Sequence, residues 1–168
     1  MQVIVHGITS IMITSAVLGA SGYSGTELVR LLATRDDVSL TLLVAASSAG
    51  KAVRDLYPSL AGTVDASYEP YDPKTLAGTD MVFLALPSGE AMNIVPELSR
   101  TVGRIIDLGG DFRLPTAALY QEYYSHAHSA PEFLGTSVYG LPEINHHRIR
   151  EARLVANPGC YPTAVLLA

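Results

Sequence analysis

The fold is decided by one stretch of the sequence, Gly19-Ala20-Ser21-Gly22-Tyr23-Ser24-Gly25. The run before it, Ile11 to Leu18, is mostly apolar and rich in β-forming residues, which predicts a strand. The run after it, Thr26 to Thr34, places leucine and valine on one helical face. A glycine turn between a strand and a helix is the setting in which a dinucleotide-binding loop occurs.

Each glycine of this loop has a separate physical role. Gly19 permits the tight turn, Gly22 lets the backbone approach a pyrophosphate, and Gly25 lets the helix pack close to the strand. The helix N-terminus then binds the anion. The spacing is Gly-x-x-Gly-x-x-Gly instead of the commoner Gly-x-Gly-x-x-Gly, so the alternative is a plain glycine-rich turn before a surface helix. The residues that this motif predicts to bind the cofactor are Gly19, Gly22 and Gly25.

The end of the second predicted strand, Val38 to Ala46, bears on the choice of cofactor. In NAD-specific folds an acidic residue near this point binds the ribose diol. Here the following residues hold no carboxylate but offer Ser47, Ser48 and Lys51, which can donate hydrogen bonds to a 2′-phosphate. The pattern predicts NADP(H) instead of NAD(H). The alternative is an ordinary polar loop.

The strand and helix signals continue to alternate along the chain. A short strand is predicted at Tyr68 to Tyr71, a buried strand at Met81 to Leu86, a helix up to about Arg100 and a strand at Gly103 to Leu108. This alternation predicts an α/β, Rossmann-like, doubly wound and mostly parallel sheet. Ligands bind beyond the carboxyl ends of such strands, so Leu86, Pro87 and Ser88 are further candidates for the cofactor site. A plain strand-to-helix turn is the alternative for these three.

Composition limits the classes of protein. Hydrophobic residues make up 48% of the 168 residues and charged residues 16%, as in one globular domain, which we predict at residues 12–168. The formal charge of −5 argues against nucleic acid or an anionic membrane as a partner, and no apolar run reaches membrane-spanning length. Residues 1–11 lack the features of a signal peptide and are interpreted as a start-site extension or a cloning remnant. The single cysteine excludes an internal disulfide and suits a reducing cytoplasm.

That cysteine, Cys160, follows a short predicted strand ending at Leu154 to Ala156 and the sharp turn Pro158-Gly159. A helix is predicted from Pro162 onward, since proline suits a first helical turn. A thiol at a helix N-terminus lies among N–H groups without partners, and that environment favours the thiolate. The alternative for a lone cysteine is a small buried hydrophobe.

Other polar residues are open to more than one interpretation. Arg113 lies just past a strand and two glycines, where its guanidinium could bind a phosphate or carboxylate, or could form a surface pair with Asp111.

A metal site is not predicted at the histidines, because no Cys or Glu cluster accompanies them. Pro115 to Tyr124 is predicted to be helical, and Tyr139 to Glu143 to be a rigid turn. The histidines concerned are His126, His128, His146 and His147, of which the last two are placed near a loop.

Four signatures in order resemble the family of N-acetyl-gamma-glutamyl-phosphate reductases of arginine biosynthesis. They are GASGYSG from Gly19, DLGGDFR from Asp107, YGLPE from Tyr139 and NPGCYPTA from Asn157. The related aspartate-semialdehyde dehydrogenases share the plan but differ around the cysteine. The resemblance covers essentially all of the chain after about Ile11.

The resemblance implies a reaction and the roles of several residues. Ser21, Tyr23 and Ser24 would join Gly19, Gly22 and Gly25 in binding the pyrophosphate of the cofactor. Family members reduce an N-acetylglutamyl phosphate to the semialdehyde with NADPH and release phosphate. By position, Cys160 would be the nucleophile that forms a thioester, Arg113 would bind the substrate phosphate and Asn157 would help to orient the site. The substrate would be a small-molecule acyl phosphate.

The resemblance also implies what this chain lacks. Family members continue past the cysteine into a second domain that carries the acid-base histidine and the dimer contacts, so the full-length protein would be a homo-oligomer. The chain would then be the cofactor-binding part, with little or no turnover alone, because a placed acid-base group contributes about 10²–10⁴-fold to rate. The alternatives are a non-catalytic NADP-binding module and an enzyme of the aspartate-semialdehyde dehydrogenase type.

Overall fold

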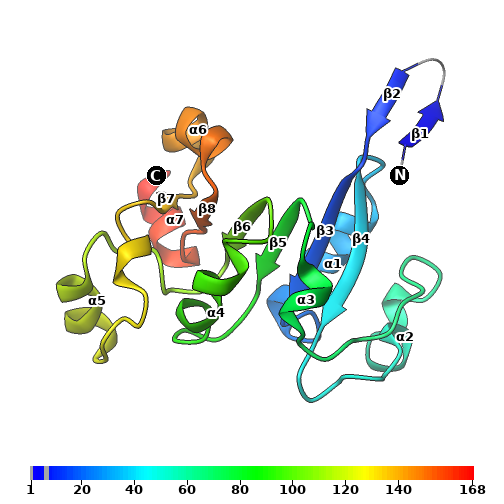
Figure 1. Ribbon diagram of the computed structural model, residues 1–168, viewed down its shortest axis with the longest axis horizontal. Coiled ribbons are helices and arrows are strands. Elements are labelled where there is room, and N and C mark those ends of the chain that lie inside the picture. The colour runs from blue at the N-terminus through cyan, green and yellow to red at the C-terminus, as the bar shows by residue number, and fades with distance from the viewer. Residues whose placement is uncertain (1, 6–7) are drawn as a thin grey trace.

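Six parallel strands in the order β4-β3-β5-β6-β8-β7 form the central sheet (Figure 1). The computed structural model describes residues 2–5 and 8–168. The strand order runs from β3 outward in both directions, which makes the sheet doubly wound and places the switch point between the adjacent strands β3 and β5. The predicted fold class is therefore confirmed.

The elements are as follows. The strands are β1 (Gln2–Val5), β2 (Ile8–Ile11), β3 (Ile13–Leu18), β4 (Val38–Val44), β5 (Met81–Leu84), β6 (Arg104–Asp107), β7 (Val138–Tyr139) and β8 (Leu154–Ala156). The α-helices are α1 (Tyr23–Ala33), α2 (Val53–Leu56), α3 (Pro73–Leu76), α4 (Ala91–Leu98), α5 (Ala117–Tyr124), α6 (Pro142–Glu151) and α7 (Cys160–Leu166). Two 3₁₀ turns are η1 (Pro58–Leu60) and η2 (Pro131–Phe133).

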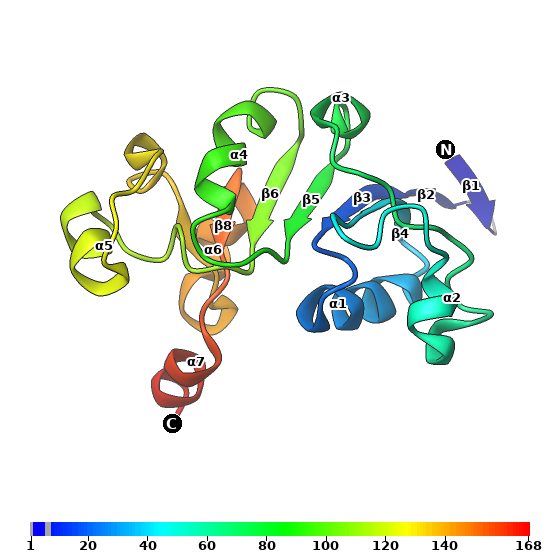
Figure 2. The ribbon, with the colours of Figure 1, turned by 90° about the horizontal axis from the view of Figure 1, so that it is seen from below.

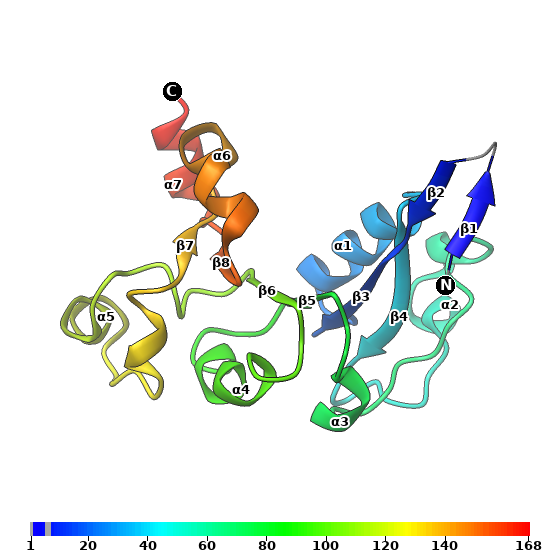
Figure 3. The ribbon, with the colours of Figure 1, turned by 45° about the horizontal axis from the view of Figure 1, so that its top comes forward.

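Helices cover both faces of the sheet, so alternate residues of the strands enter two separate cores. Figures 2 and 3 show α1, α6 and α7 on one side and α3 and α4 on the other. In β3, Val17 packs toward α1 and α2, whereas Ala16 and Leu18 pack toward α3 and α4. Burial of both faces explains why these strands are almost continuously apolar in sequence.

Three predicted elements differ from the structure. His146 and His147 lie within α6, not near a loop, and that helix begins at Pro142, inside the segment predicted as a rigid turn. Between residues 68 and 71 only Glu69 makes an isolated bridge, to Val44. Helix α7 begins at Cys160, two residues earlier than predicted. Helix α6 starts at a proline and α7 directly follows a glycine, so turn residues and not apolar periodicity set where these two helices begin.

The predicted extension, residues 1–11, includes Met1, His6 and Gly7, which lie outside the described residues. The described parts, β1 and β2, form an antiparallel pair apart from the six-stranded sheet. Figure 1 shows this pair extending from the start of β3. It lies away from the carboxyl ends of the strands, where the candidate site lies.

Candidate functional site

A cavity of about 760 Å³ lies at the carboxyl ends of β3, β4 and β5. It occupies the switch point of the sheet, which is where ligands bind in open α/β folds. Of the residues predicted to bind the cofactor, the structure brings eight together there: Gly19, Ser21, Gly22, Tyr23, Ser24, Ser47, Leu86 and Pro87. The other four do not line it: Gly25, Ser48, Lys51 and Ser88.

The glycines at the base of this cavity are set by close contacts. Gly19 has a φ of +77°, and a Cβ there would lie 2.2 Å from the Ala85 carbonyl oxygen. A Cβ on Gly25 would lie 2.1 Å from the Gly19 carbonyl oxygen. A Cβ on Gly22, by contrast, would meet only that oxygen, at 3.4 Å. Gly19 and Gly25 are thus required by packing, whereas Gly22 leaves space on the cavity side.

Helix α1 presents unpartnered N–H groups to this cavity. Its N-cap is Gly22, with no side-chain cap, and its first intrahelical bond is donated by Thr26 to Gly22 at 2.8 Å. The N–H groups of Tyr23, Ser24 and Gly25 therefore have no acceptor within the helix. These donors and the helix dipole suit an anion such as a pyrophosphate. The loop fits the group that its sequence predicts.

Other residues that line the same cavity were not predicted from the sequence. Tyr71 lies on the opposite wall, and burial raises its pKa, with the Glu97 and Asp72 carboxylates adding to the effect. Glu90 and Ile94 reach the cavity from the turn after β5 and from α4. No local motif marks these positions. Tyr71 follows an irregular segment, and its place beside the cavity comes from the bridge between Glu69 and Val44.

A second cavity, of about 830 Å³, adjoins the first. It is lined by the residues predicted for chemistry, Cys160, Arg113 and Asn157, and by Glu143, for which the sequence indicated no role. Ser24 lines both cavities, so the glycine loop and the cysteine turn border one continuous region of the surface. The strand ends of β3, β5, β6 and β8 bring these distant segments together.

Arg113 is held in place by backbone oxygens. Its Nε donates to the Asn157 carbonyl and its Nη2 to the Leu108 carbonyl, each at 2.8 Å. Its Nη1 lies beside Gly159, where an added Cβ would be 3.1 Å away. The guanidinium thus fixes the turn before the cysteine and leaves Nη1 as the nitrogen with no hydrogen bond among the described residues. The alternative of a surface pair with Asp111 is wrong, because Asp111 is buried and bonds to other groups.

Cys160 is the first residue of α7 and is exposed. The interpretation of a small buried hydrophobe is therefore wrong. The turn before it is fixed by Thr163, whose hydroxyl donates to the Gly159 carbonyl at 2.9 Å. The thiol is accessible from the second cavity, which its own residue lines.

Asp107, at the end of β6, is a buried acid near these cavities. Its Oδ1 accepts from the Gly109 N–H at 2.9 Å, whereas Oδ2 is buried without a hydrogen-bond partner among the described residues. Burial raises the pKa of Asp107 to about 7, and the bond from Gly109 opposes that rise only in part. The carboxyl is therefore neutral over much of the acid range.

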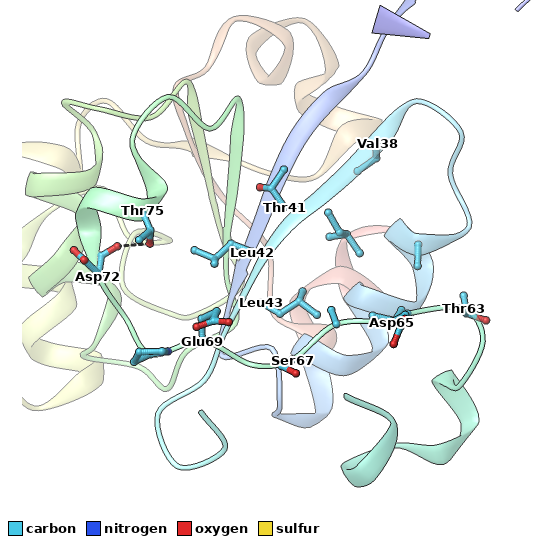
Figure 4. A pocket seen from close by; sticks show the side chains of 15 residues that line it. Val38, Thr41, Leu42, Leu43, Thr63, Asp65, Ser67, Glu69, Asp72 and Thr75 are labelled. Atoms are coloured by element: carbon cyan, nitrogen blue, oxygen red, sulfur yellow. Dashed lines mark hydrogen bonds between the residues drawn. The ribbon is translucent and has the colours of Figure 1, made fainter. Parts of the chain in front are cut away.

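Other parts of the surface do not gather the predicted residues. A cavity of about 680 Å³ follows the outer edge of β4, lined by residues such as Leu42, Asp65 and Glu69 (Figure 4), and none of the predicted site residues borders it. Within residues 2–5 and 8–168 there is no cluster of three metal-ligating side chains. In the same ranges, no helix is long and apolar enough to cross a membrane.

Comparison with known proteins gives the class to which this fold and site belong. The chain belongs to the semialdehyde dehydrogenase family: the family model described as semialdehyde dehydrogenase, NAD binding domain, matches residues 14–152. Solved structures agree on the fold. Aspartate semialdehyde dehydrogenase II of Vibrio cholerae complexed with ASA matches 93% of this chain and 44% of its own, with a TM-score of 0.67 and 19% identity. The aspartate semialdehyde dehydrogenase with NADP from Candida albicans matches 92% and 45%, with a TM-score of 0.59 and 14% identity.

The relatives found by sequence similarity share a more specific name. The N-acetyl-gamma-glutamyl-phosphate reductase of Acidithiobacillus ferrooxidans is 48% identical over 156 residues, 93% of this chain and 45% of the relative. The protein of the same name from Alkalilimnicola ehrlichii is 46% identical over 154 residues, 92% of this chain and 45% of the relative. The chain thus spans about 45% of the length of these relatives. The predicted family resemblance is confirmed, and the family's NAD-binding domain supports a nicotinamide dinucleotide as the class of cofactor.

Proposed function

We propose that this chain is the nucleotide-binding part of an NADP-dependent N-acetyl-gamma-glutamyl-phosphate reductase, an oxidoreductase of arginine biosynthesis, and that it carries the nucleophile of the reaction. The observation that carries the proposal is the adjacency of two cavities that share Ser24. One presents the glycine loop and the start of α1. The other presents the only cysteine of the sequence beside an arginine. The names of the sequence relatives support the substrate class.

The glycine loop would hold the pyrophosphate of the cofactor through the N–H groups of Tyr23, Ser24 and Gly25. When bound, the cofactor supplies the hydride that reduces the acyl group. Ser47 lines the same cavity and could donate to a 2′-phosphate, while no carboxylate in residues 46–51 would repel it. Ser48 is buried, and Lys51 is exposed outside the cavity, so the preference for NADP rests mainly on Ser47.

The chemistry of Cys160 follows from the bonds that must change. The thiolate Sγ attacks the acyl carbon of the acyl phosphate, the C–O bond to phosphate breaks, and phosphate leaves with the bonding electrons. The result is a thioester on Cys160. Reduction of that thioester and departure of the aldehyde return the thiolate. Arg113 Nη1 would bind the phosphate that leaves, since its other two nitrogens are already bonded to backbone oxygens.

Asn157 would act through the backbone. Its carbonyl accepts from Arg113 Nε, and its side-chain Nδ2 donates to the Pro158 carbonyl at 3.2 Å. Both bonds shape the turn that presents Cys160. The second domain of the longer relatives, an acid-base histidine within it and a homo-oligomeric state remain parts of this proposal for the full-length protein, as does a cytoplasmic location.

The test is covalent capture of the acyl group on the chain itself. N-acetylglutamyl 5-phosphate is mixed with the protein and with the variant Cys160→Ala, and the products are digested and measured by mass spectrometry. We expect an acyl adduct on the peptide that contains Cys160 and none in the variant. The absence of any adduct in a chain that still binds NADPH would favour the non-catalytic binding module.

Cofactor choice has a separate test. NADPH and NADH are titrated against the chain by their fluorescence, with Ser47→Ala as the comparison. We expect tighter binding of NADPH, and a loss of that preference by several-fold in Ser47→Ala, as for one hydrogen bond to a charged group. Equal affinities in the unmodified chain would remove the case for NADP.

The choice of substrate is tested by the adduct experiment with a second acyl phosphate. An adduct formed equally well from aspartyl phosphate would favour the aspartate-semialdehyde dehydrogenase alternative.

A further inference from the structure

Asp111 is a buried carboxylate whose bonds reach across the sheet to the cofactor cavity. It follows β6, yet its Oδ1 accepts from the Gly89 N–H at 2.7 Å and its Oδ2 from the Met92 N–H at 3.0 Å. Both donors belong to the segment that follows β5 and opens α4. Asp111 thus caps helix α4 from 19 residues further along the chain, and it accepts from N–H groups that the start of the helix leaves unpaired.

The segment that Asp111 holds forms part of the cavity wall. The 87–90 turn, Pro87-Ser88-Gly89-Glu90, contributes Pro87 and Glu90 to the lining. Gly89 has a φ of +95°, a conformation that glycine adopts without strain. The position of this turn, and therefore the shape of the cavity, depends on the bond from Gly89 to Asp111.

A series of hydrogen-bonded side chains connects Asp111 with the surface. The Tyr120 hydroxyl lies 3.1 Å from Asp111 Oδ1 and 3.0 Å from His126 Nε2. Tyr120 is fully buried, whereas His126 is exposed. The other ring nitrogen of His126, Nδ1, is 2.8 Å from the Tyr124 carbonyl oxygen, which can only accept, so Nδ1 carries a proton.

The single proton of the Tyr120 hydroxyl cannot serve both neighbours. If His126 is neutral, its Nε2 is an acceptor and competes with Asp111 for that proton. If His126 is protonated, Nε2–H donates to Tyr120, and Tyr120 donates to Asp111, so every group in the chain is satisfied. Burial raises the pKa of Tyr120, with Asp111 as a further cause, which keeps the hydroxyl protonated as this arrangement requires.

We propose that Asp111, Tyr120 and His126 are positioning residues for the nucleotide site, and that protonation of His126 completes the hydrogen-bonded chain that holds the 87–90 turn against the bound dinucleotide. The proposal rests on the proposed function, since it assigns the cavity to the nucleotide. It gives the direction of the effect: nucleotide affinity is higher when His126 is protonated than when it is neutral.

The ionisable groups on the elements packed around His126 are few. Tyr120 and Tyr124 come from α5, Asp111 from the turn after β6, His128 from the same loop as His126, and Glu90 from the 87–90 turn. His128 has both nitrogens engaged, with Nε2 2.9 Å from the Asp111 carbonyl and Nδ1 accepting from Ala130 at 3.0 Å. Asp107 is not hydrogen-bonded to these groups, but its pKa, raised by burial to about 7, responds to its charge interaction with Asp111, so the experiment must separate it from His126.

The experiment is a fluorescence titration of NADPH against the chain at several pH values from about 5.5 to 8, the range in which histidine side chains ordinarily change charge. We expect the Kd to rise roughly three- to tenfold across this range, as for the loss of one hydrogen bond. His126→Gln, whose amide can donate to Tyr120 at every pH, should keep the low-pH affinity throughout. His126→Phe and Tyr120→Phe should show the weaker affinity throughout.

His147→Gln is the matched control, because His147 is an exposed histidine on α6, outside the network. It should retain the pH dependence of the unmodified chain. A pH dependence that persists in His126→Phe would assign the effect to another group, such as Asp107 or the 2′-phosphate of NADPH, and would overturn the proposal. So would an affinity in the unmodified chain that does not change with pH.

A second readout does not need the nucleotide. The amide N–H signals of Gly89 and Met92 in an NMR spectrum should shift with pH in the unmodified chain and in His147→Gln, and should lose that shift in His126→Gln. If NADPH binds to no variant, the cofactor assignment fails. The two amide signals still show whether the hydrogen bonds from Asp111 through Tyr120 to His126 form. Signals that titrate equally in His126→Gln would overturn the proposal.

Discussion

The glycine loop and the cysteine turn lie at the same edge of the sheet but are held by different forces. Helix α1, after the glycine loop, buries Gly25, Val29 and Leu32 against the strands. Helix α7, after the cysteine turn, buries none of its residues, and Tyr161 and Val165 are 83% and 76% exposed. The nucleotide loop is therefore fixed by packing, whereas the thiol is fixed by the hydrogen bonds of its turn. Substitutions should affect stability in the first region and mainly geometry in the second.

The largest effect should come from Gly19→Ala. A methyl group there meets the Ala85 carbonyl carbon and oxygen, and the backbone has a positive φ, so the substitution carries both overpacking and conformational strain. We expect a loss of about 4 kcal/mol in the free energy of unfolding, measured by urea denaturation. Nucleotide binding should be lost with it.

Gly62→Ala separates the two causes. Gly62 has a nearly equal φ of +80°, but nothing lies within 4 Å of the added Cβ. Gly62→Ala should lower the free energy of unfolding by only about 1 kcal/mol, from the backbone strain alone. Equal losses in the two variants would show that the close packing of the glycine loop is not what stabilises this region.

The next effect concerns Asp107 and the pH. Its pKa of about 7 in the folded chain exceeds the ordinary value of 3.8, so between these values the folded state holds a proton that the unfolded state has lost. Stability from this group is therefore greatest in acid and falls as the pH rises toward 7. The fall should be roughly 3 kcal/mol in the free energy of unfolding between about pH 4 and pH 7.

Asp107→Asn is the variant that isolates this effect. Asparagine keeps an acceptor for the Gly109 N–H but does not titrate. The difference in unfolding free energy between the two chains, followed by urea denaturation at successive pH values, should change over that window in favour of the variant. A constant difference would mean that Asp107 is not neutral in the folded chain. The comparison is needed because Asp80, whose pKa is lowered by Thr14, responds to pH in the opposite sense.

The elements around the glycine loop could be predicted because their signals are local. The strand before Gly19 and the helix after Gly25 have clear periodicity, and the structure confirms both. Helix α6 could not be predicted from such a signal, because it has no buried residues and its composition is polar. Its position is set by the turn at Pro142 and by β7 and β8 on either side of it.

The residues of the site also differ in whether local sequence could predict them. Gly19, Ser24 and Cys160 could be placed from motifs, since a motif encodes the geometry of its own backbone. Tyr71 and Asp111 could not, because each reaches the site through contacts with segments far away in sequence. The roles of Ser48 and Lys51 depended on the exact path of the loop after β4, which periodicity does not determine; the structure leaves both outside the cavity.

A smaller effect is expected from Arg113→Lys. Lysine keeps the charge but cannot bond the Asn157 and Leu108 carbonyls in the fork geometry of the guanidinium. We expect a loss of about 1 to 2 kcal/mol in unfolding free energy, since two hydrogen bonds to a charged group are disrupted. The rate of alkylation of Cys160 by iodoacetamide should change as well, because the turn before the thiol loses its support.

Arg35→Lys is the control for this prediction. Arg35 also makes a forked pair, with Asp37, but on the exposed surface and remote from the cysteine. The alkylation rate of Cys160 should be unchanged in Arg35→Lys. If Arg113→Lys also leaves that rate unchanged, the arginine does not position the thiol and the hydrogen-bonded turn is held by Thr163 alone.

The smallest effect should come from Leu166→Ala, and it tests the comparison most directly. Leu166, on α7, is 51% exposed, so truncation removes little packing and should change the unfolding free energy by no more than about 0.5 kcal/mol. Leu32→Ala makes the same change on α1, where the side chain is 8% exposed, and should cost about 2 kcal/mol or more because a cavity forms in the core. Urea denaturation of both variants under one condition gives the difference. Similar costs would mean that α7 packs against the domain in solution, and that the cysteine is then held by burial of its helix as firmly as the glycine loop is held by α1.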